Sequence, residues 1–184
     1  LHPAWQDILS RCTPDALGVA QSVLIERTGP MSTGRQLVAC SYAEAADMLG
    51  SLVGEVTEIT ATGVLAAGRL VVQHRTATGQ AGEIRLAPTA SDSDRWRLKV
   101  KTERVKVEVL WEAGLDGAAT LRWLDDSGNH EIVHPAPAPD QQILAEFERA
   151  MKSEPHTIRW SDAIRAAELA DAAWLSLERR RSVD

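Results

Sequence analysis

The chain has 184 residues, 44% of them hydrophobic, with 20 basic and 26 acidic side chains and a net charge of −6. This length fits one domain that buries roughly 70% of the surface exposed by its unfolded form. The negative charge disfavours nucleic acid and anionic membrane surfaces as partners. No apolar run approaches the roughly 18 residues of a membrane-spanning helix, so no such helix is expected.

The cysteine content and the first residue bear on where the chain comes from. Cys12 and Cys40 are too few for a disulfide framework, so a reducing cytoplasm is the expected location. The sequence begins at Leu1, with neither an initiator methionine nor a basic-then-apolar leader. We therefore expect a processed or excised piece of a longer protein.

The first third of the chain predicts a helix, a strand and a second helix. Residues 1–18 indicate a short helix followed by a turn. The β-branched run 19–27 predicts a strand that ends at the breaker Thr28-Gly29-Pro30. Apolar residues at helical spacing over 45–53 predict an amphipathic helix with Gly54 as its C-cap.

The following residues, up to about position 134, alternate between apolar and polar side chains and predict an extended sheet. Leu70, Val72 and His74 share one strand face, for example, while the opposite faces carry Arg, Lys and Glu. A sheet that is apolar on one face only is typical of antiparallel pairing. The turn residues 126–129 add a hairpin signal.

Two helices are expected to close the chain. After the spacer of Pro135, Pro137 and Pro139, Asp140 can cap a helix with an apolar edge, and Ser161 can cap a longer one. The apolar edge of the first contains Ile143, Phe147, Ala150 and Met151, and that of the second contains Ala163, Ala166, Ala167, Ala170, Ala173, Trp174 and Leu177. The element order predicts one α+β domain over 1–184, with helices packed on one face of a large, mostly antiparallel open sheet.

The segment Gly34–Ala61 resembles the start of the C-terminal domain of the Gfo/Idh/MocA oxidoreductase family. The family pattern is G-G-G-x-x-x-D-x-G-x-H-x-x-D, then an amphipathic helix ending in L-L-G, then a strand of the type E-V-x-E-V-x-A, and the spacing here matches without a gap. His2–Ala4 followed by Leu17-Gly18 is similar to the family's entry segment, and Trp160–Ala173 with Ser176 to its closing helix. The fold implied resembles the C-terminal domain of glyceraldehyde-3-phosphate dehydrogenase-like enzymes.

The resemblance implies an NAD(P)-dependent oxidoreductase acting on a sugar or polyol, with a Rossmann domain upstream for NAD or NADP. The C-terminal sheet then covers the substrate site and forms the contacts between copies in a homo-oligomer. This chain has neither a G-x-G-x-x-G nor an E-K-P motif with the family's catalytic lysine, so alone it is expected to bind no dinucleotide. The alternative is a noncatalytic scaffold or a regulatory, ligand-binding module that kept the fold.

Three residues of the matched pattern are the candidate site. Cys40 occupies the usual Asp position and Glu44 the usual His position, as candidate catalytic groups, while Asp47 retains the second acid, as a candidate substrate ligand. A Glu near pKa 4.3 and a thiol near 8.5 exchange protons less well at neutral pH than an imidazole near 6.5. Because losing a general base costs about 100-fold to 10,000-fold in rate, we expect poor alcohol dehydrogenation even with a Rossmann partner.

Each candidate also has a structural interpretation, which we favour. Cys40 can be a thiol activated at a helix N-terminus or a small packing residue. Glu44 can be a base whose pKa a dry pocket raises, or a solvated first-turn acid, and Asp47 suits a polar helix face.

Three further patterns allow a binding role. The stripe Arg95, Arg97, Lys99 and Lys101 can hold an anionic ligand or a phosphorylated sugar, but pairing with acids such as Glu108 is favoured. His130 and His134 lie about 13 Å apart if they are on one strand, which disfavours a shared metal. The six tryptophans are interpreted as core or interface residues, with sugar stacking as the alternative.

Overall fold

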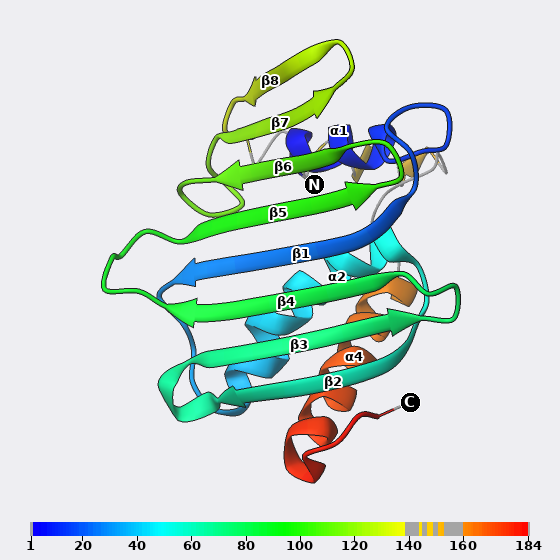
Figure 1. The fold of residues 1–184 in the computed structure, drawn as a ribbon. Helices are drawn as coiled ribbons and strands as arrows, with labels where there is room; N and C mark the ends of the chain where they lie inside the picture. The colour runs from blue at the N-terminus through cyan, green and yellow to red at the C-terminus, as the bar shows by residue number, and fades with distance from the viewer. Residues whose placement is uncertain (1, 139–143, 145–146, 149–150, 153–159, 184) are drawn as a thin grey trace.

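The computed structural model describes residues 2–138, 144, 147–148, 151–152 and 160–183. One eight-stranded sheet dominates it, in the order β2-β3-β4-β1-β5-β6-β7-β8 (Figure 1). The strands are β1 (Ala20–Gly29), β2 (Val56–Val64), β3 (Arg69–Thr76), β4 (Ala81–Pro88), β5 (Arg95–Thr102), β6 (Lys106–Trp111), β7 (Ala119–Asp125) and β8 (Gly128–His134). The helices are α1 (Pro3–Arg11), the π-helix η1 (Leu37–Tyr42), α2 (Ala43–Val53), the 3₁₀ turn η2 (Leu65–Ala67) and α4 (Trp160–Arg179).

The sheet is antiparallel except at its centre, where β1 runs parallel to β4. The chain leaves β1 through α2, enters the sheet again at its edge strand β2, and returns strand by strand until β4 reaches β1. The expected α+β class with a mostly antiparallel sheet is confirmed. The long connection through α2 explains the parallel pair, because parallel neighbours need a crossover.

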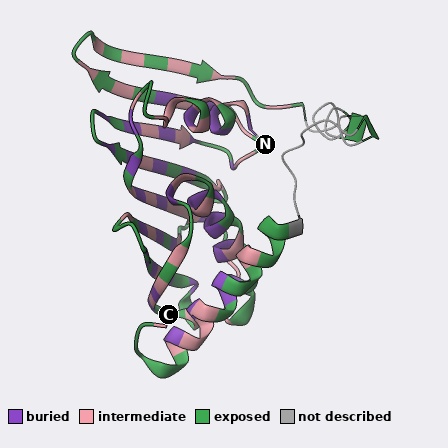
Figure 2. Ribbon diagram, turned by 90° about the vertical axis from the view of Figure 1, so that its right-hand side faces the viewer, coloured by how far each residue is buried: buried purple, intermediate pink, exposed green. Residues whose placement is uncertain are grey.

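The helices lie on one face of the sheet, and the other face carries no described helix (Figures 1 and 2). Side chains on the helix-covered face are buried at every second position of β3, β4 and β5, and those between them are half-buried or exposed. The alternation seen in the sequence therefore identified the buried face correctly. Trp5, Trp96 and Trp111 lie in this core, as the interpretation of the tryptophans predicted.

Helix α2 packs against β1 and β4 with the apolar residues expected for it. Leu49 is fully buried and lies so close to Gly82 of β4 that a Cβ at position 82 would be 2.5 Å from a Leu49 methyl group. Gly54 ends the helix with φ of 78°, a conformation that favours glycine, so the expected C-cap is confirmed. The π-helix η1 that precedes α2 was not predicted.

Helix α4 differs from the expectation at its start. It begins at Trp160, so Ser161 lies inside the first turn and its hydroxyl donates to Asp162; the predicted N-cap role of Ser161 is wrong. Only the second half of the helix is buried, through Leu169, Ala170, Ala173 and Ser176, because α4 packs on β2 and α2 rather than across the sheet. The predicted helix capped by Asp140 lies largely outside the described residues.

A buried polar pair fastens η1 to the sheet. Tyr42 and His74 are 0% and 1% exposed, and the Tyr42 hydroxyl lies 2.7 Å from His74 Nε2. The two rings are nearly parallel, with centroids 5.8 Å apart. Burial lowers the pKa of His74 to about 4, because the apolar surroundings disfavour the charged imidazole. His74 is therefore neutral in the folded chain at pH 7.

We expect this pair to make stability depend on pH. Between about pH 6.5 and pH 4 the unfolded His74 binds a proton and the folded one does not, so stability is lost as pH falls through that window. The loss amounts to about 3 kcal/mol. His74→Gln, which keeps a hydrogen-bonding side chain without this titration, should lose about that much less free energy of unfolding between pH 7 and pH 4, measured by urea denaturation. Parallel pH profiles of the two proteins would contradict this.

Candidate functional site

Arg27 is the centre of a charged cluster at the end of β1. It lies in phase with Val23 and Ile25, so its side chain leaves the strand on the helix-covered face. Its guanidinium stacks 4.7 Å from the ring centroid of Trp96 and donates two hydrogen bonds to Asp94, through Nε at 3.0 Å and Nη2 at 2.9 Å. The planar guanidinium fits both partners, since it binds a carboxylate with two parallel bonds and stacks on an aromatic face.

Asp94 is fixed from several sides. The indole N–H of Trp96 donates to its Oδ2 at 3.1 Å, and the backbone N–H of Gly114 donates to its carbonyl oxygen. The loop carrying Asp94 also passes close to Gly29, where a Cβ would lie 2.8 Å from Asp94 Cα. A glycine at the end of β1 thus allows the loop before β5 to approach the strand.

Glu44 joins this cluster from the first turn of α2. Its Oε2 accepts a hydrogen bond from Arg27 Nη1 at 3.0 Å, and half of its side-chain surface stays accessible. Burial raises the pKa of Glu44 and Arg27 opposes the shift, while Asp94 and Asp116 add to it. The Glu44 carboxylate is therefore a partly shielded proton acceptor that solvent can still reach.

Among the described residues, neither of the other two predicted site residues forms an ion pair or a side-chain hydrogen bond with this cluster. Asp47 lies on the α4 side of α2, in a hollow of about 110 Å³ that Asp162 and Arg165 also line. Burial and the neighbouring Asp162 raise the pKa of Asp47. Cys40 lies in η1 with its side chain exposed and takes part in no side-chain hydrogen bond with the residues described. Of the three candidates, only Glu44 meets the Arg27 cluster.

Sequence reasoning missed Arg27 and Asp94. The sequence did contain an indication for Arg27. It alternates in phase with Val23 and Ile25, so its side chain is expected on the buried face, where a charged group requires an oppositely charged or hydrogen-bonding partner. Asp94 had no such signal, since it lies in an irregular loop before β5 and meets Arg27 only through the tertiary fold.

The two histidines of β8 bind different carboxylates. His130 Nε2 lies 2.9 Å from Asp125 and its ring stacks on Trp123 at 4.7 Å, whereas His134 Nε2 lies 3.2 Å from Asp7 of α1. Among the described residues, no three His, Cys, Asp or Glu side chains are arranged to hold a metal ion. No helix within the described part of the chain combines the length and apolar character needed to cross a membrane.

No protein-family model and no curated protein matches the sequence, but solved structures match its fold. UDP-N-acetylglucosamine 3-dehydrogenase from Acidithiobacillus ferrooxidans is similar at 15% identity and a TM-score of 0.75, over 97% of this chain and 59% of that one. A myo-inositol dehydrogenase from Corynebacterium glutamicum ATCC 13032 is similar at 18% identity and a TM-score of 0.72, over 98% and 61%. A 3-ketoreductase from Actinomadura kijaniata, solved with NADP, is similar at 14% identity and a TM-score of 0.71, over 96% of this chain and 57% of that one.

These likenesses show the fold. The open eight-stranded sheet with helices on one side matches the C-terminal domain of Gfo/Idh/MocA dehydrogenases, as the resemblance in the sequence predicted. The chain spans about three-fifths of the length of these solved structures. Its sequence contains no glycine-rich G-x-G-x-x-G turn of the kind that holds a dinucleotide pyrophosphate in a Rossmann domain.

The Arg27 cluster should contribute measurably to stability. Arg27→Met keeps much of the side-chain volume but leaves Asp94 and Glu44 without their cation, so we expect a loss of about 2–4 kcal/mol in the free energy of unfolding at pH 7. Urea denaturation measures it. The control is Arg85→Met, which removes a half-exposed arginine that is also paired with acids and should cost less than about 1 kcal/mol. Equal losses in both variants would contradict the special role of Arg27.

Proposed function

We propose that the chain is the substrate-side, oligomer-building domain of an NAD(P)-dependent oxidoreductase that acts on a sugar or polyol in the cytoplasm. One observation supports the proposal above all. The structural match to solved dehydrogenases of UDP-N-acetylglucosamine and myo-inositol includes nearly all of this chain but only about three-fifths of those proteins. NAD or NADP would then be held by a domain outside these 184 residues.

The proposed sugar site is the Arg27 cluster. Glu44 offers a carboxylate that is half accessible, and carboxylates are strong acceptors for sugar hydroxyl groups. Arg27 holds this carboxylate in one orientation and is itself held by Asp94 and by the face of Trp96. A site whose groups are positioned before the ligand arrives loses less entropy on binding.

Catalysis of alcohol oxidation by this site should be weak. The reaction requires a group that takes the hydroxyl proton, and Glu44 stands where the family pattern has histidine. Burial raises the pKa of Glu44 towards a useful range, but its ion pair with Arg27 stabilises the charged form and opposes that shift. Among the described residues, Cys40, at the other replaced position, forms no side-chain hydrogen bond with Glu44.

Pairing of copies through the open face of the sheet is the proposed mode of assembly. The face is broad, and no described helix covers it (Figure 2). Cross-strand ion pairs run over it, for example Arg122 with Glu131 at 2.7 Å and Arg95 with Glu112 at 3.1 Å. Alternating charges of this kind can meet a complementary copy of the same face.

The second candidate is a noncatalytic module that kept the fold for scaffolding, regulation or ligand binding. Tyr42 favours it, because this buried tyrosine stands at a glycine position of the family pattern and packs on His74. The replaced residues Cys40 and Glu44 favour it as well. The two candidates differ in turnover.

Binding of a sugar at Glu44 can be measured by tryptophan fluorescence, since Trp96 belongs to the cluster. A saturable change with myo-inositol or a related polyol is expected for the chain, and at least a tenfold weaker apparent affinity for Glu44→Gln. Glu131→Gln is the matched control, because Glu131 is also half-exposed and also bound to an arginine. If both variants titrate like the unsubstituted chain, the proposed sugar site is wrong.

Turnover distinguishes the two candidates. The protein expressed from the full reading frame is incubated with NAD and NADP and a panel of polyols, and reduced cofactor is followed by absorbance. We expect turnover at least 100-fold below that of myo-inositol dehydrogenase assayed alongside, because the proton acceptor is impaired. Turnover matching that enzyme would contradict impaired catalysis. Polyol binding without turnover would support the noncatalytic module.

A further inference from the structure

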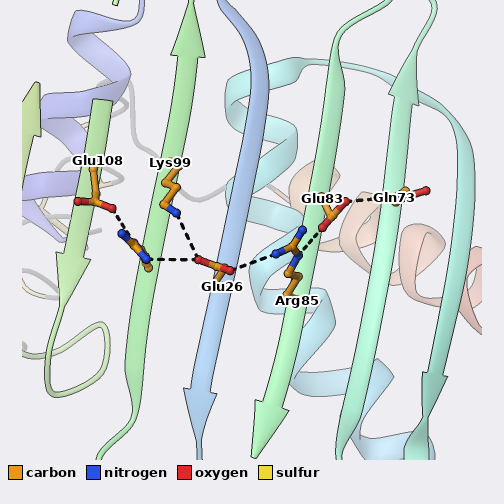
Figure 3. Close-up of polar contacts among 7 residues, drawn as sticks. Glu26, Gln73, Glu83, Arg85, Lys99 and Glu108 are labelled. Carbon is orange, nitrogen blue, oxygen red and sulfur yellow. Dashed lines mark hydrogen bonds and ion pairs between the residues drawn. The ribbon is translucent and has the colours of Figure 1, made fainter. Parts of the chain in front are cut away.

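Around Glu26, the charged side chains on the open face of the sheet are paired with one another. Glu26, on the central strand β1, lies within 3.9 Å of three cations from β4 and β5: Arg85, Arg97 and Lys99. Figure 3 shows these contacts running across the sheet to Glu83 and Gln73 on one side and to Glu108 on the other. The pairing with acids favoured from the sequence therefore holds for the first three cations of the β5 stripe, including Arg95 with Glu112.

Lys101, the fourth cation of that stripe, has different surroundings. It stands directly opposite Lys106 of β6, and neither lysine forms an ion pair with any described residue. Like charges directly opposite one another in a sheet are destabilising. On the other side, the register continues from Lys101 through Ser22 and Ala81 to Arg75 of β3, which is also without an ion pair among the described residues. Three cations thus flank two small residues in one row.

A hollow of about 750 Å³ lies over this row. Ser22 and Ala81 line it between Arg75 on one side and the two lysines on the other. Its two acids are already engaged, because Glu83 binds Arg85 and Gln73, and Glu108 binds Arg97 at 2.6 Å. The hollow therefore presents an excess of positive charge, although the whole chain has a net charge of −6.

We propose that this hollow binds a small multivalent oxyanion, of the polyphosphate or tricarboxylate class. Backbone N–H groups in the interior of a sheet are used in the strand ladders, so the donors available are ammonium and guanidinium groups, whose strongest partners are phosphate and carboxylate oxygens. Arg75 and Lys101 are three strand spacings apart, about 14 Å, so a ligand with several anionic groups is required to reach both sides. Such a ligand also relieves the repulsion between Lys101 and Lys106.

This site is separate from the proposed sugar site. Arg27 and Glu44 lie on the helix-covered side of the sheet, and Lys101 and Lys106 lie on the open side. The hollow lies on the face through which copies are proposed to pair, and it is accessible in a single copy.

Thermal unfolding of the chain with tripolyphosphate or citrate tests the proposal. Sodium chloride at matched ionic strength controls for screening, because it also weakens the repulsion between the two lysines. With free tripolyphosphate or citrate about tenfold above its dissociation constant, we expect the Tm to rise by about 3–6 °C over the chloride control. A rise with only one of them identifies phosphate or carboxylate as the preferred group and supports the site in either case.

Two variants locate the effect. Lys106→Glu replaces the opposed pair of like charges with an attractive pair, so it should fold at least as well as the unsubstituted chain and lose the anion-dependent rise. Arg95→Gln removes an exposed cation of the same face, outside the hollow, and should keep the rise. A rise no larger than that with chloride, or one that persists in Lys106→Glu, would overturn the proposal. Light scattering of the same samples reports the pairing of copies separately.

Discussion

Burial of one face of a single sheet is the constraint on which the remaining structure depends. Eight strands place every second side chain on the helix side, where α1, α2 and α4 lie. This arrangement fixes the register of each strand, because a shift by one residue would exchange the buried and exposed faces. The close contact of Gly82 with Leu49 and the buried pair of Tyr42 and His74 are possible only in that register.

The two faces lead to different kinds of chemistry. On the helix side a charge is tolerated only with partners, and Arg27 has them in Asp94, Glu44 and the ring of Trp96. On the open side charges are solvated and need no fixed partner, so Lys101 and Lys106 can stand opposite each other at a modest cost. This difference explains why the helix side holds the Glu44 carboxylate in a fixed ion pair, while the open side carries a positively charged hollow.

The fold and a catalytic site depend on different features of the sequence. At 14% to 18% identity the solved dehydrogenases and the 3-ketoreductase share the sheet and helices of this chain. Such a fold depends on the apolar pattern and tolerates exchange of individual side chains. Catalysis depends on particular side chains, and the resemblance of Gly34–Ala61 to the family pattern implies that Cys40 and Glu44 stand at the Asp and His positions. The shared fold therefore does not by itself carry a dehydrogenase activity over to this chain.

The sequence by itself determined the α+β class, the buried faces of β3 to β6 and the C-cap at Gly54, because these depend on local periodicity and local backbone conformation. It also indicated Glu44 as a candidate site residue, which stays a prediction, and the structure places Glu44 in an ion pair with Arg27. Only the tertiary structure decided that Asp94 reaches Arg27 across 67 positions of the chain, and that Asp47 faces α4 instead. The same holds for Lys101, whose neighbour Lys106 follows from the register of β5 with β6. Contacts between distant segments depend on how whole elements pack, and no local pattern encodes that packing.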